Sequence, residues 1–384
     1  MSEWTIRHLR TFEQFDSLAS EWDTLLAATQ TENIFLTHGW LNEWWRVYGG
    51  RRELWTLVAS SAGGRVDGIA PLVLERDRHG TRRLVLMGTG EVAPNHLDLI
   101  AQEGRQTELL RSFVAYLLQN RAQWDLLELD TLPQLSPTRE LLIDLLRRHG
   151  LAVRAEVSSR CPYAVLPCSF EAYLQSRGRK TRAQLRYSRN RLKRQVPEAR
   201  FIRVETPQAF EPAFDALVRL HQARWTQRGQ AGSFSTPEFK TFHRAAARAA
   251  LASGALRLYA LQIGDAFAAI YYCFRVGSHV IYYNAGFDEA WGRHSVGMQT
   301  LAYAIEQSIA EGAAEFDFIQ GDEPYKTHWA THTRDNWRVC AASPHLRGRL
   351  AWWRIQATEN ARAWSHRYLS RETRRTLKRL LRQA

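Results

Sequence analysis

The residues best suited to chemistry lie between Tyr283 and Trp329. A turn that contains Gly and Ser, residues 292–297, precedes a helix expected at 298–311. The first amide groups of a helix have no internal partner, so they can hold an anionic group such as a phosphate. A strand expected at 315–319 follows, and a run of Asp, Glu, Tyr and Lys comes after it. These features predict a site for a phosphate-carrying ligand beside a site for a polar acceptor.

Length and composition allow two domains, because the chain has 384 residues of which 45% are hydrophobic. The N-terminus has no basic region followed by an apolar run, and no window of about 18 residues is free of charge, so we expect neither a signal peptide nor a membrane span. The four cysteines lack metal-ligand or redox spacing, which is typical of packing residues in a reducing cytoplasm. The expected location is the cytoplasm.

The net charge of +13 comes from two stretches of the chain. Residues 177–194 hold nine Lys and Arg and no acidic residue, and residues 345–384 hold eleven against two Glu. The basicity therefore needs a local explanation.

The first half is predicted to alternate helices and strands, which gives a mixed sheet with helices on its faces. The expected helices are 11–28, 38–48, 105–120 and 137–149, and the expected strands are 4–9, 55–60, 66–75, 84–87, 96–100, 125–129 and 152–156.

The second half is predicted to repeat this alternation of helices and strands. It is expected to begin after a boundary between Ser158 and Phe170, where two prolines interrupt the pattern. The expected helices are 178–195, 207–228, 237–253 and 298–311, and the expected strands are 200–205, 256–263, 266–276, 279–285 and 315–319. We find no sequence repeat, but the shared order of helices, antiparallel strands, helix and strand predicts two similar halves.

Several motifs of the second half occur in a known order. They are Leu220-His221-Gln222-Ala223-Arg224-Trp225, Tyr283-Asn284-Ala285-Gly286-Phe287, Ser295-Val296-Gly297, Phe316-Asp317-Phe318 and Gly321-Asp322-Glu323-Pro324-Tyr325-Lys326. On these motifs, residues 177–344 resemble the CelD/BcsL-like acetyltransferases of bacterial polysaccharide biosynthesis. That family belongs to the GNAT superfamily and is similar to the Fem-type peptidyltransferases. The first half, with Phe35-Leu36-Thr37-His38-Gly39-Trp40, also looks like the first half of these tandem proteins.

The resemblance implies an α/β (α+β mixed) fold of tandem GNAT-like domains, each a largely antiparallel mixed sheet flanked by helices. The expected domains are residues 1–160, an N-terminal GNAT-like domain, and 161–344, a GNAT acyltransferase domain. Residues 345–384 are expected to form a basic amphipathic helical tail.

The resemblance also implies acetyl-CoA or another acyl-CoA as donor. The groups that would hold its diphosphate are the Arg293 side chain and the amides of His294, Ser295, Val296, Gly297 and Met298. One departure from the superfamily pattern is that Val296 stands where the first Gly of the pyrophosphate loop belongs. The alternative is that Ser295 only caps the helix and Gly297 only packs.

Acyl transfer from a thioester also needs a base for the attacking group and a proton for the leaving thiolate. Asp317, between two Phe residues, would point to the opposite face of its strand, and a raised pKa would suit it as the base. The alternative is a structural partner for Lys326 or an arginine. Glu323 and Asp322 are further candidate carboxylates. Tyr283 is the candidate proton donor, unless it is a core residue.

Acceptor-binding candidates lie on one helix and just after the last expected strand. His221, Trp225 and Arg228 have the spacing of one helix face, which fits either an acceptor pocket or packing. Tyr325 and Lys326 could bind an anionic group or form a surface ion pair. His328 and His332 have zinc-pair spacing but no third ligand, so we expect no metal.

The basic stretches have competing explanations as well. The helix at 178–195 could face a substrate or only solvent. The tail places Trp352, Trp353, Ile355, Trp364, Tyr368, Leu369, Leu377, Leu380 and Leu381 among arginines, which is typical of segments that lie on anionic membranes or pack on a protein. No DNA-recognition motif is visible, so DNA binding is not expected.

The sequence therefore predicts an acyl-CoA-dependent N- or O-acyltransferase that acts on a sugar, a glycan precursor or an amino compound. The implied setting is bacterial polysaccharide biosynthesis, such as cellulose biosynthesis. Two alternatives stay open. One is a Fem-like transferase that takes an aminoacyl group from charged tRNA, and the other is a non-catalytic scaffold at the inner membrane surface.

Overall fold

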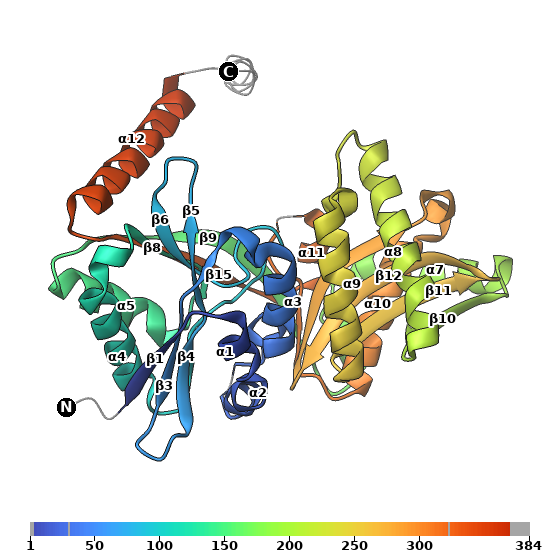
Figure 1. Cartoon of the computed structure of the whole chain (residues 1–384). Helices are drawn as coiled ribbons and strands as arrows, with labels where there is room; N and C mark the ends of the chain where they lie inside the picture. Colours follow the sequence, from blue (N-terminus) through green and yellow to red (C-terminus); the bar gives the residue numbers. More distant parts are fainter. Residues whose placement is uncertain (1–3, 30, 322, 369–384) are drawn as a thin grey trace.

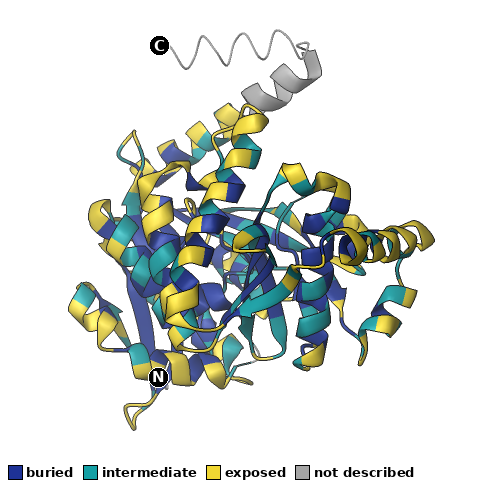
Figure 2. Cartoon of the chain, turned by 90° about the vertical axis from the view of Figure 1, so that its right-hand side faces the viewer, coloured by how far each residue is buried: buried dark blue, intermediate teal, exposed yellow. Residues whose placement is uncertain are grey.

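The computed structural model describes residues 4–29, 31–321 and 323–368, with side chains up to Thr358. Two halves lie side by side and share one large sheet (Figure 1). The strands of this sheet are mostly buried, and the helices that cover it carry the exposed outer faces (Figure 2). The mixed α/β architecture expected from the sequence is confirmed.

The first half contains most of the short strands. Its helices are α1 (Phe12–Asp16), α2 (Ala19–Ala27), η1 (Ile34–Leu36), α3 (His38–Tyr48), η2 (Gly49–Arg51), α4 (Gln106–Gln119), η3 (Arg121–Gln123) and α5 (Pro137–Arg148). Its strands are β1 (Thr5–Leu9), β2 (Glu53–Leu54), β3 (Thr56–Ser60), β4 (Val66–Ala70), β5 (Leu72–Arg76), β6 (Arg82–Leu86), β7 (Ile100–Ala101), β8 (Leu126–Pro133) and β9 (Ala152–Val165).

The second half contains the longer helices and a meander of long strands. Its helices are α6 (Phe170–Gln175), α7 (Arg179–Gln195), α8 (Pro207–Gln227), η4 (Ser233–Ser235), α9 (Pro237–Ala252), η5 (Glu289–His294), α10 (Val296–Ala310), α11 (Pro324–Trp329) and α12 (Leu346–Tyr368). Its strands are β10 (Ala199–Val204), β11 (Leu256–Ile263), β12 (Ala266–Val276), β13 (His279–Phe287), β14 (Glu315–Asp317) and β15 (His332–Ala342).

The two halves exchange their last strands. The large sheet has the order β10-β11-β12-β13-β14-β9-β15-β8-β6-β5-β2, and a second sheet has the order β1-β3-β4-β7. Strand β9 ends the first half but pairs with β14 of the second, while β15 pairs with β8 of the first. Each half also has one parallel pair, β6 with β8 and β13 with β14, joined through a helix. This matching order is what two similar halves predict.

The predicted division at residue 160 falls inside β9, whose pairing with β15 continues from Ala152 to Tyr163. The domain limits therefore remain a prediction, and the two halves are joined through a continuous sheet rather than a linker.

Three predicted elements of the first half are wrong in detail. The helix expected at 11–28 is two helices, because α1 ends at Asp16 and α2 starts after Leu18. The strand expected at 66–75 is divided at Pro71, which has no amide hydrogen for a ladder, so β4 and β5 belong to different sheets. The strand expected at 96–100 does not form before Ile100, because His96 has a left-handed φ of 56°.

Helix α12 leaves the body at one side (Figure 1). Its first turns pack on the sheet, where Ala351 is buried with Leu126 and Cys340. Residues 369–384, which include the predicted apolar positions Leu369, Leu377, Leu380 and Leu381, lie outside the described residues, as do the side chains of Trp364 and Tyr368. Among the described helices, none is both long and apolar enough to cross a membrane.

Candidate active site

A gap in the large sheet marks the candidate site. Strand β13 pairs in parallel with β14 only through its first residues, His279 to Ile281. Beyond Ile281 it stays paired with β12 as far as Phe287, but its edge toward β14 has no partner strand. The chain after β14 turns away through Ile319 and Gly321, both with positive φ. Gly321 has a φ of 135°, which residues with a side chain rarely adopt, so glycine suits this turn.

A cavity of about 700 Å³ opens at this gap, and we call it the α8 cavity. Both halves of the chain contribute to it. Its polar and aromatic lining consists of Tyr48, Glu91, His221, Arg224, Trp225, Arg228, Ser233, Ser235, Thr236, Glu238, Phe239, Tyr282, Tyr283, Asn284, Gln320, Glu323, Tyr325 and Lys326. Seven predicted site residues are therefore brought together, namely Tyr283, Glu323, His221, Trp225, Arg228, Tyr325 and Lys326.

Helix α8 lines this cavity with the predicted stripe of His221, Trp225 and Arg228. Two of these side chains also bond to each other. Trp225 Nε1 donates to His221 Nε2 at 2.8 Å, and His221 Nδ1 lies 3.2 Å from Gln222 Oε1. Burial, aided by the nearby charge of Arg224, lowers the pKa of His221 to about 4, so its imidazole is neutral near pH 7. An acceptor pocket and helix packing are therefore compatible interpretations of the stripe. His221 and Trp225 line the cavity, and their hydrogen bond also stabilises the end of the helix.

The close approach of α8 to β13 depends on Gly286. A Cβ atom there would lie 2.7 Å from the His221 amide nitrogen and 3.0 Å from the Leu217 carbonyl oxygen. No side chain fits at such distances from backbone atoms, which explains why a glycine interrupts this strand. The contact positions His221 over the strand that carries Tyr282 and Tyr283.

Two tyrosine hydroxyls meet where β13 separates from β14. Tyr325 from α11 donates a hydrogen bond to the Tyr282 hydroxyl at 3.2 Å. Burial, with the charge of Glu323, raises the pKa of Tyr325 to about 12, so this phenol is protonated at neutral pH. The pair can therefore donate hydrogen bonds into the cavity.

Lys326 is the buried cation of the cavity, with 3% of its surface exposed. Its Nζ donates to the Gln320 carbonyl oxygen at 2.7 Å and forms an ion pair with Glu323 at 3.0 Å. Glu323 itself is half exposed. The alternative of an ordinary surface ion pair is wrong for Lys326, because its ammonium group is buried at the cavity wall. Asp322, the neighbouring candidate, lies outside the described residues.

Tyr283 lines the same cavity, but its hydroxyl is engaged. It donates to the Val92 carbonyl oxygen at 2.6 Å, and burial raises its pKa well above the usual value. Its ring packs against Phe35, Trp40 and His243. Tyr283 therefore has the contacts of a core residue, which is the alternative to its predicted role as a proton donor.

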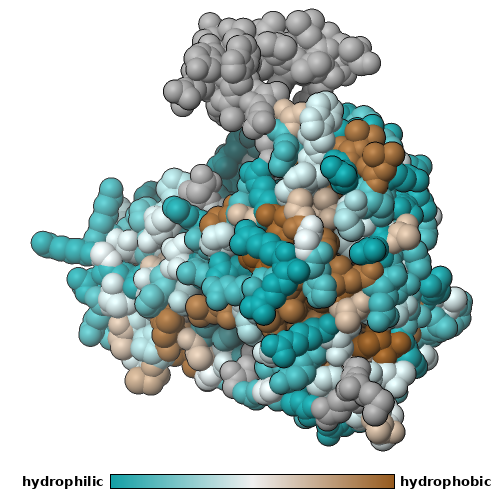
Figure 3. Space-filling model, turned by 90° about the vertical axis from the view of Figure 1, so that its left-hand side faces the viewer, coloured by the Kyte–Doolittle hydropathy of each residue, from teal (hydrophilic) through white to brown (hydrophobic). Residues whose placement is uncertain are grey.

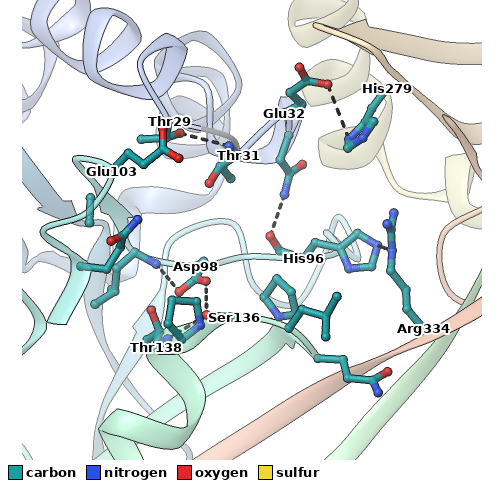
Figure 4. Close-up of a pocket in the computed structure, with 18 of the residues that line it drawn as sticks. Thr29, Thr31, Glu32, His96, Asp98, Glu103, Ser136, Thr138, His279 and Arg334 are labelled. Carbon is teal, nitrogen blue, oxygen red and sulfur yellow. Dashed lines mark hydrogen bonds and ion pairs between the residues drawn. The ribbon is translucent and has the colours of Figure 1, made fainter. Parts of the chain in front are cut away.

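Asp317 lies in a different cavity, of about 500 Å³, which we call the His96 cavity (Figure 4). The carboxylate accepts from the Ile319 amide at 2.6 Å, lies 2.9 Å from His96 Nε2, and forms an ion pair with Arg334. Burial acts to raise its pKa, but the charges and hydrogen bonds of His96 and Arg334 outweigh burial and hold that pKa well below the usual value.

The expected raised pKa of Asp317 is therefore wrong. The physical reason is that Arg334 forms an ion pair with the carboxylate and His96 forms a hydrogen bond with it. An arginine partner for Asp317 is the structural alternative named above. Phe316 and Phe318 do point to the opposite face, where they join the core below α10.

The rest of the His96 cavity is also internally paired. Figure 4 shows Glu32 and His279 directed toward each other from the two halves, and Glu32 also accepts from the amide and hydroxyl of Ser278 at 2.7 Å. At the opposite wall Ser136 donates to Asp98, whose pKa is raised by burial.

The predicted diphosphate turn lies outside both cavities. Ser295 has a left-handed φ of 52° and gives no side-chain cap to α10, so its expected alternative role as the N-cap hydrogen-bond acceptor is not seen. The His294 ring is buried and lies 3.1 Å from Arg293 Nε. Gly297 packs tightly, since a Cβ atom would lie 2.9 Å from the Phe287 ring. Diphosphate binding by Arg293, His294, Ser295, Val296, Gly297 and Met298 remains a prediction.

Several cavity residues were not predicted from the sequence. Arg224 lies three residues after His221 on α8, so the same helical spacing could have found it; its guanidinium lies 4.5 Å from the Phe287 ring centroid. Tyr48 and Glu91 come from the first half, and no local pattern relates them to the second. Within the described residues no group of three or more His, Cys, Asp or Glu side chains could hold a metal ion.

Comparison with known proteins identifies the domain. Residues 179–327 match the sequence profile described as an acetyltransferase (GNAT) domain. A search of curated proteins found no match. The profile covers the GNAT class, and the finer resemblance to CelD/BcsL-like proteins is not confirmed.

Several solved structures resemble most of the chain in fold. FemX is 10% identical, with a TM-score of 0.63 over 87% of this chain and 96% of FemX. The C-terminal domain of a putative lysylphosphatidylglycerol synthetase from Agrobacterium fabrum is 13% identical, with a TM-score of 0.52 over 88% and 96%. The structure titled L-PGS from Bacillus licheniformis is 12% identical, with a TM-score of 0.53 over 83% and 90%. At these identities the likeness concerns the fold. Residues 179–327 thus match a GNAT acetyltransferase domain, and the chain shares its fold with FemX. The domain match supports a transferase enzyme.

Proposed function

We propose that this enzyme transfers an acyl group from an acyl-CoA, acetyl-CoA in the simplest case, to a hydroxyl or amine of a polar acceptor bound in the α8 cavity. The observation that carries the proposal is the separation of β13 from β14, which opens directly onto that cavity. A thioester reaching through the gap would meet the acceptor beside Tyr325 and Lys326.

The donor's diphosphate would be held at the start of α10. Arg293 is exposed there, and the first-turn amides of Val296, Gly297 and Met298 have no acceptor within the helix. The left-handed Ser295 also contributes no side-chain cap that would compete for these amides. These donors fit an anionic group, although Val296 replaces the usual glycine.

The charge of the α8 cavity favours a polar acceptor. Its lining contains three cationic residues, Arg224, Arg228 and Lys326, and three acidic ones, Glu91, Glu238 and Glu323. Such a balanced lining, with tyrosine and tryptophan edges, suits a sugar, a glycan precursor or an amino compound. The proposed setting is polysaccharide or cell-envelope biosynthesis on the cytoplasmic side.

Two protons move in the proposed reaction, and residues of the cavity lining could accept one and supply the other. Attack by the acceptor forms a C–O or C–N bond and breaks the C–S bond, so the acceptor loses a proton and the thiolate gains one. Under this proposal Glu323 would take the first proton. The Tyr325–Tyr282 pair, which burial keeps neutral, would supply the second. Lys326 would stabilise the negative charge on the carbonyl oxygen.

A second candidate is aminoacyl transfer from charged tRNA, and α7 favours it. This helix exposes five cationic side chains, Arg179, Lys180, Arg186, Lys193 and Arg194, beside the exposed ring of Tyr187. Its other face is anchored by Leu185, Ser188 and Leu192. A cationic helix with an exposed ring is suited to an RNA backbone and an unstacked base.

A donor-binding experiment separates the two candidates. Full-length protein is titrated with acetyl-CoA and with charged tRNA while tryptophan fluorescence is followed, and Arg293→Ala serves as the matched variant. Saturable acetyl-CoA binding that weakens in Arg293→Ala, with thiol release when amines are added, supports the first candidate. Binding of charged tRNA alone, lost in Arg186→Gln/Arg194→Gln, overturns it in favour of the second.

A further inference from the structure

The solvent-facing side of α12 carries an apolar row. Leu346, Leu350 and Trp353 are 82%, 46% and 64% exposed, and their spacing places them on one face of the helix. On the surface of a soluble protein, exposed apolar residues normally occur singly, whereas a contiguous row of them marks an interaction site. We call this row the α12 seam. Figure 3 views the side of the molecule that carries α12, where hydrophobic patches interrupt a mainly hydrophilic surface.

Arginines flank the seam on both sides. With about 100° of rotation per residue, Arg349 falls on one side of the seam and Arg347 and Arg354 on the other. All three are exposed. The basic character extends through the sequence from residue 345 to 384, which has eleven Lys and Arg and two Glu.

The seam cannot simply turn inward, because the opposite face of α12 is fixed to the body. Ala351 is buried, and Trp352 and Ile355 pack against the Leu126–Cys340 cluster. A Cβ atom at Gly348 would lie 2.2 Å from the Ser343 carbonyl oxygen, so the first turn sits directly on the backbone. The His345 ring also bonds to the Trp124 carbonyl oxygen at 2.9 Å.

We propose that the α12 seam docks the enzyme on an anionic membrane surface. Leucine and tryptophan side chains would enter the headgroup region while Arg349 and Arg354 contact lipid phosphates. Arg347 already donates to the Gly80 carbonyl oxygen at 3.1 Å and contributes only its charge. Charge decides against a second copy of this chain, because two such faces would bring like-charged arginines together. This inference does not depend on the identity of the acyl donor.

Vesicle co-sedimentation of the full-length protein tests the proposal. The probes are vesicles of phosphatidylglycerol and phosphatidylcholine in equal parts, and vesicles of phosphatidylcholine alone. We expect binding to the anionic vesicles only. Arg349→Gln/Arg354→Gln should weaken that binding about 30-fold, and Leu346→Ser/Leu350→Ser/Trp353→Ser should weaken it at least about tenfold.

Matched controls keep the outcome decisive. Arg10→Gln/Arg111→Gln removes the same charge from exposed positions elsewhere, and Leu135→Ser/Val165→Ser removes exposed apolar side chains elsewhere. Both should bind like the parent protein, and circular dichroism checks that every variant folds. The proposal is overturned if the parent protein ignores anionic vesicles, if the controls weaken binding as much as the α12 variants, or if the seam variant abolishes a dimer without affecting vesicle binding.

Discussion

The α8 cavity and the His96 cavity are both lined in part by the loop of residues 92–96, and they differ in how their buried charged groups are paired. Ala93 lines the α8 cavity and His96 lines the His96 cavity. In the His96 cavity Asp317 is held by partners that are themselves largely buried, His96 and Arg334. In the α8 cavity the charged partner of Lys326 is Glu323, which is half exposed, and the Tyr325–Tyr282 pair lies at the same wall.

The difference shows that a buried charge does not by itself mark an active site. Asp317 is the most buried carboxylate among the predicted site residues, and its partners already satisfy it. Lys326 is nearly as buried, but its charged partner Glu323 is half exposed at the cavity wall, whereas the Arg334 and His96 side chains beside Asp317 are 26% and 13% exposed. The exposure of the partner, rather than the burial of the charged group, is therefore the better guide to a group that a ligand can reach.

The largest expected effect is on stability, in the His96 cavity. Asp317→Asn removes the charge that pairs with Arg334 and weakens the hydrogen bond with His96, so the free energy of unfolding should fall by about 3 kcal/mol. Urea denaturation followed by fluorescence measures it. Glu323→Gln is the control, since that carboxylate is half exposed and should cost well under about 1 kcal/mol. A folded Asp317→Asn enzyme of normal stability and no turnover would contradict the comparison and restore Asp317 as a catalyst.

The same ion pair predicts how stability depends on pH. Because the pKa of Asp317 is lower in the folded chain than in the unfolded chain, its stabilisation is fully present above about pH 4 and is lost as the pH falls below that value. Unfolding measured between neutral pH and about pH 3 should therefore show a shallower acid dependence in Asp317→Asn than in the parent. Parallel curves would show that the carboxylate is not held ionised by its partners.

The next effect is on activity, in the α8 cavity. Lys326→Met keeps a long side chain but removes the ammonium group, and kcat/KM should fall about 100-fold. The unfolding midpoint should change much less than in Asp317→Asn, because the exposed Glu323 can be solvated when it loses its partner. Lys240→Met, at an exposed position of α9, is the control and should keep full activity. Equal losses in both variants would remove Lys326 from the site.

A smaller effect is expected for the tyrosine pair. Tyr325→Phe should lower kcat about tenfold, the lower part of the range for a positioned proton donor. Because the pKa of Tyr325 is about 12, the parent's rate should not decline through loss of this proton below about pH 11. A pH–rate profile of both proteins checks this. A decline near pH 8 that disappears in Tyr325→Phe would show that the phenol titrates much lower than its burial implies.

Local patterns predicted much of the fold. The predicted bounds of helix α3, residues 38–48, agree with the structure, because Thr37 caps its start and an aromatic stripe defines its buried face. Strands β11 and β12 were also predicted to the residue, because short turns with glycine separate the meander strands. Strand β15 was not predicted, since its partners β8 and β9 lie far away in the sequence and its residues lack a clear alternation.

The same limit applies to the candidate site. The residues of α8 and those around α11 were found because each set lies on one short segment, where spacing determines which side chains share a face. The environment of Asp317 was not found, because His96 and Arg334 come from a loop of the first half and from the exchanged strand β15. Contacts between the two halves therefore determine the pKa of Asp317. Residue spacing within one segment of the sequence does not reveal such contacts.

The smallest effect is expected for Tyr283, which lies at the α8 cavity but is bound like a core residue. Tyr283→Phe keeps the ring contacts with Phe35 and Trp40 and removes only the hydrogen bond to the Val92 carbonyl oxygen. Unfolding free energy should fall by about 1 kcal/mol, and activity should stay within about twofold because the Tyr325–Tyr282 pair remains intact. Urea denaturation and steady-state kinetics on one preparation measure both. A loss of activity as large as that of Tyr325→Phe would show that Tyr283, despite its engaged hydroxyl, supplies a proton in the reaction.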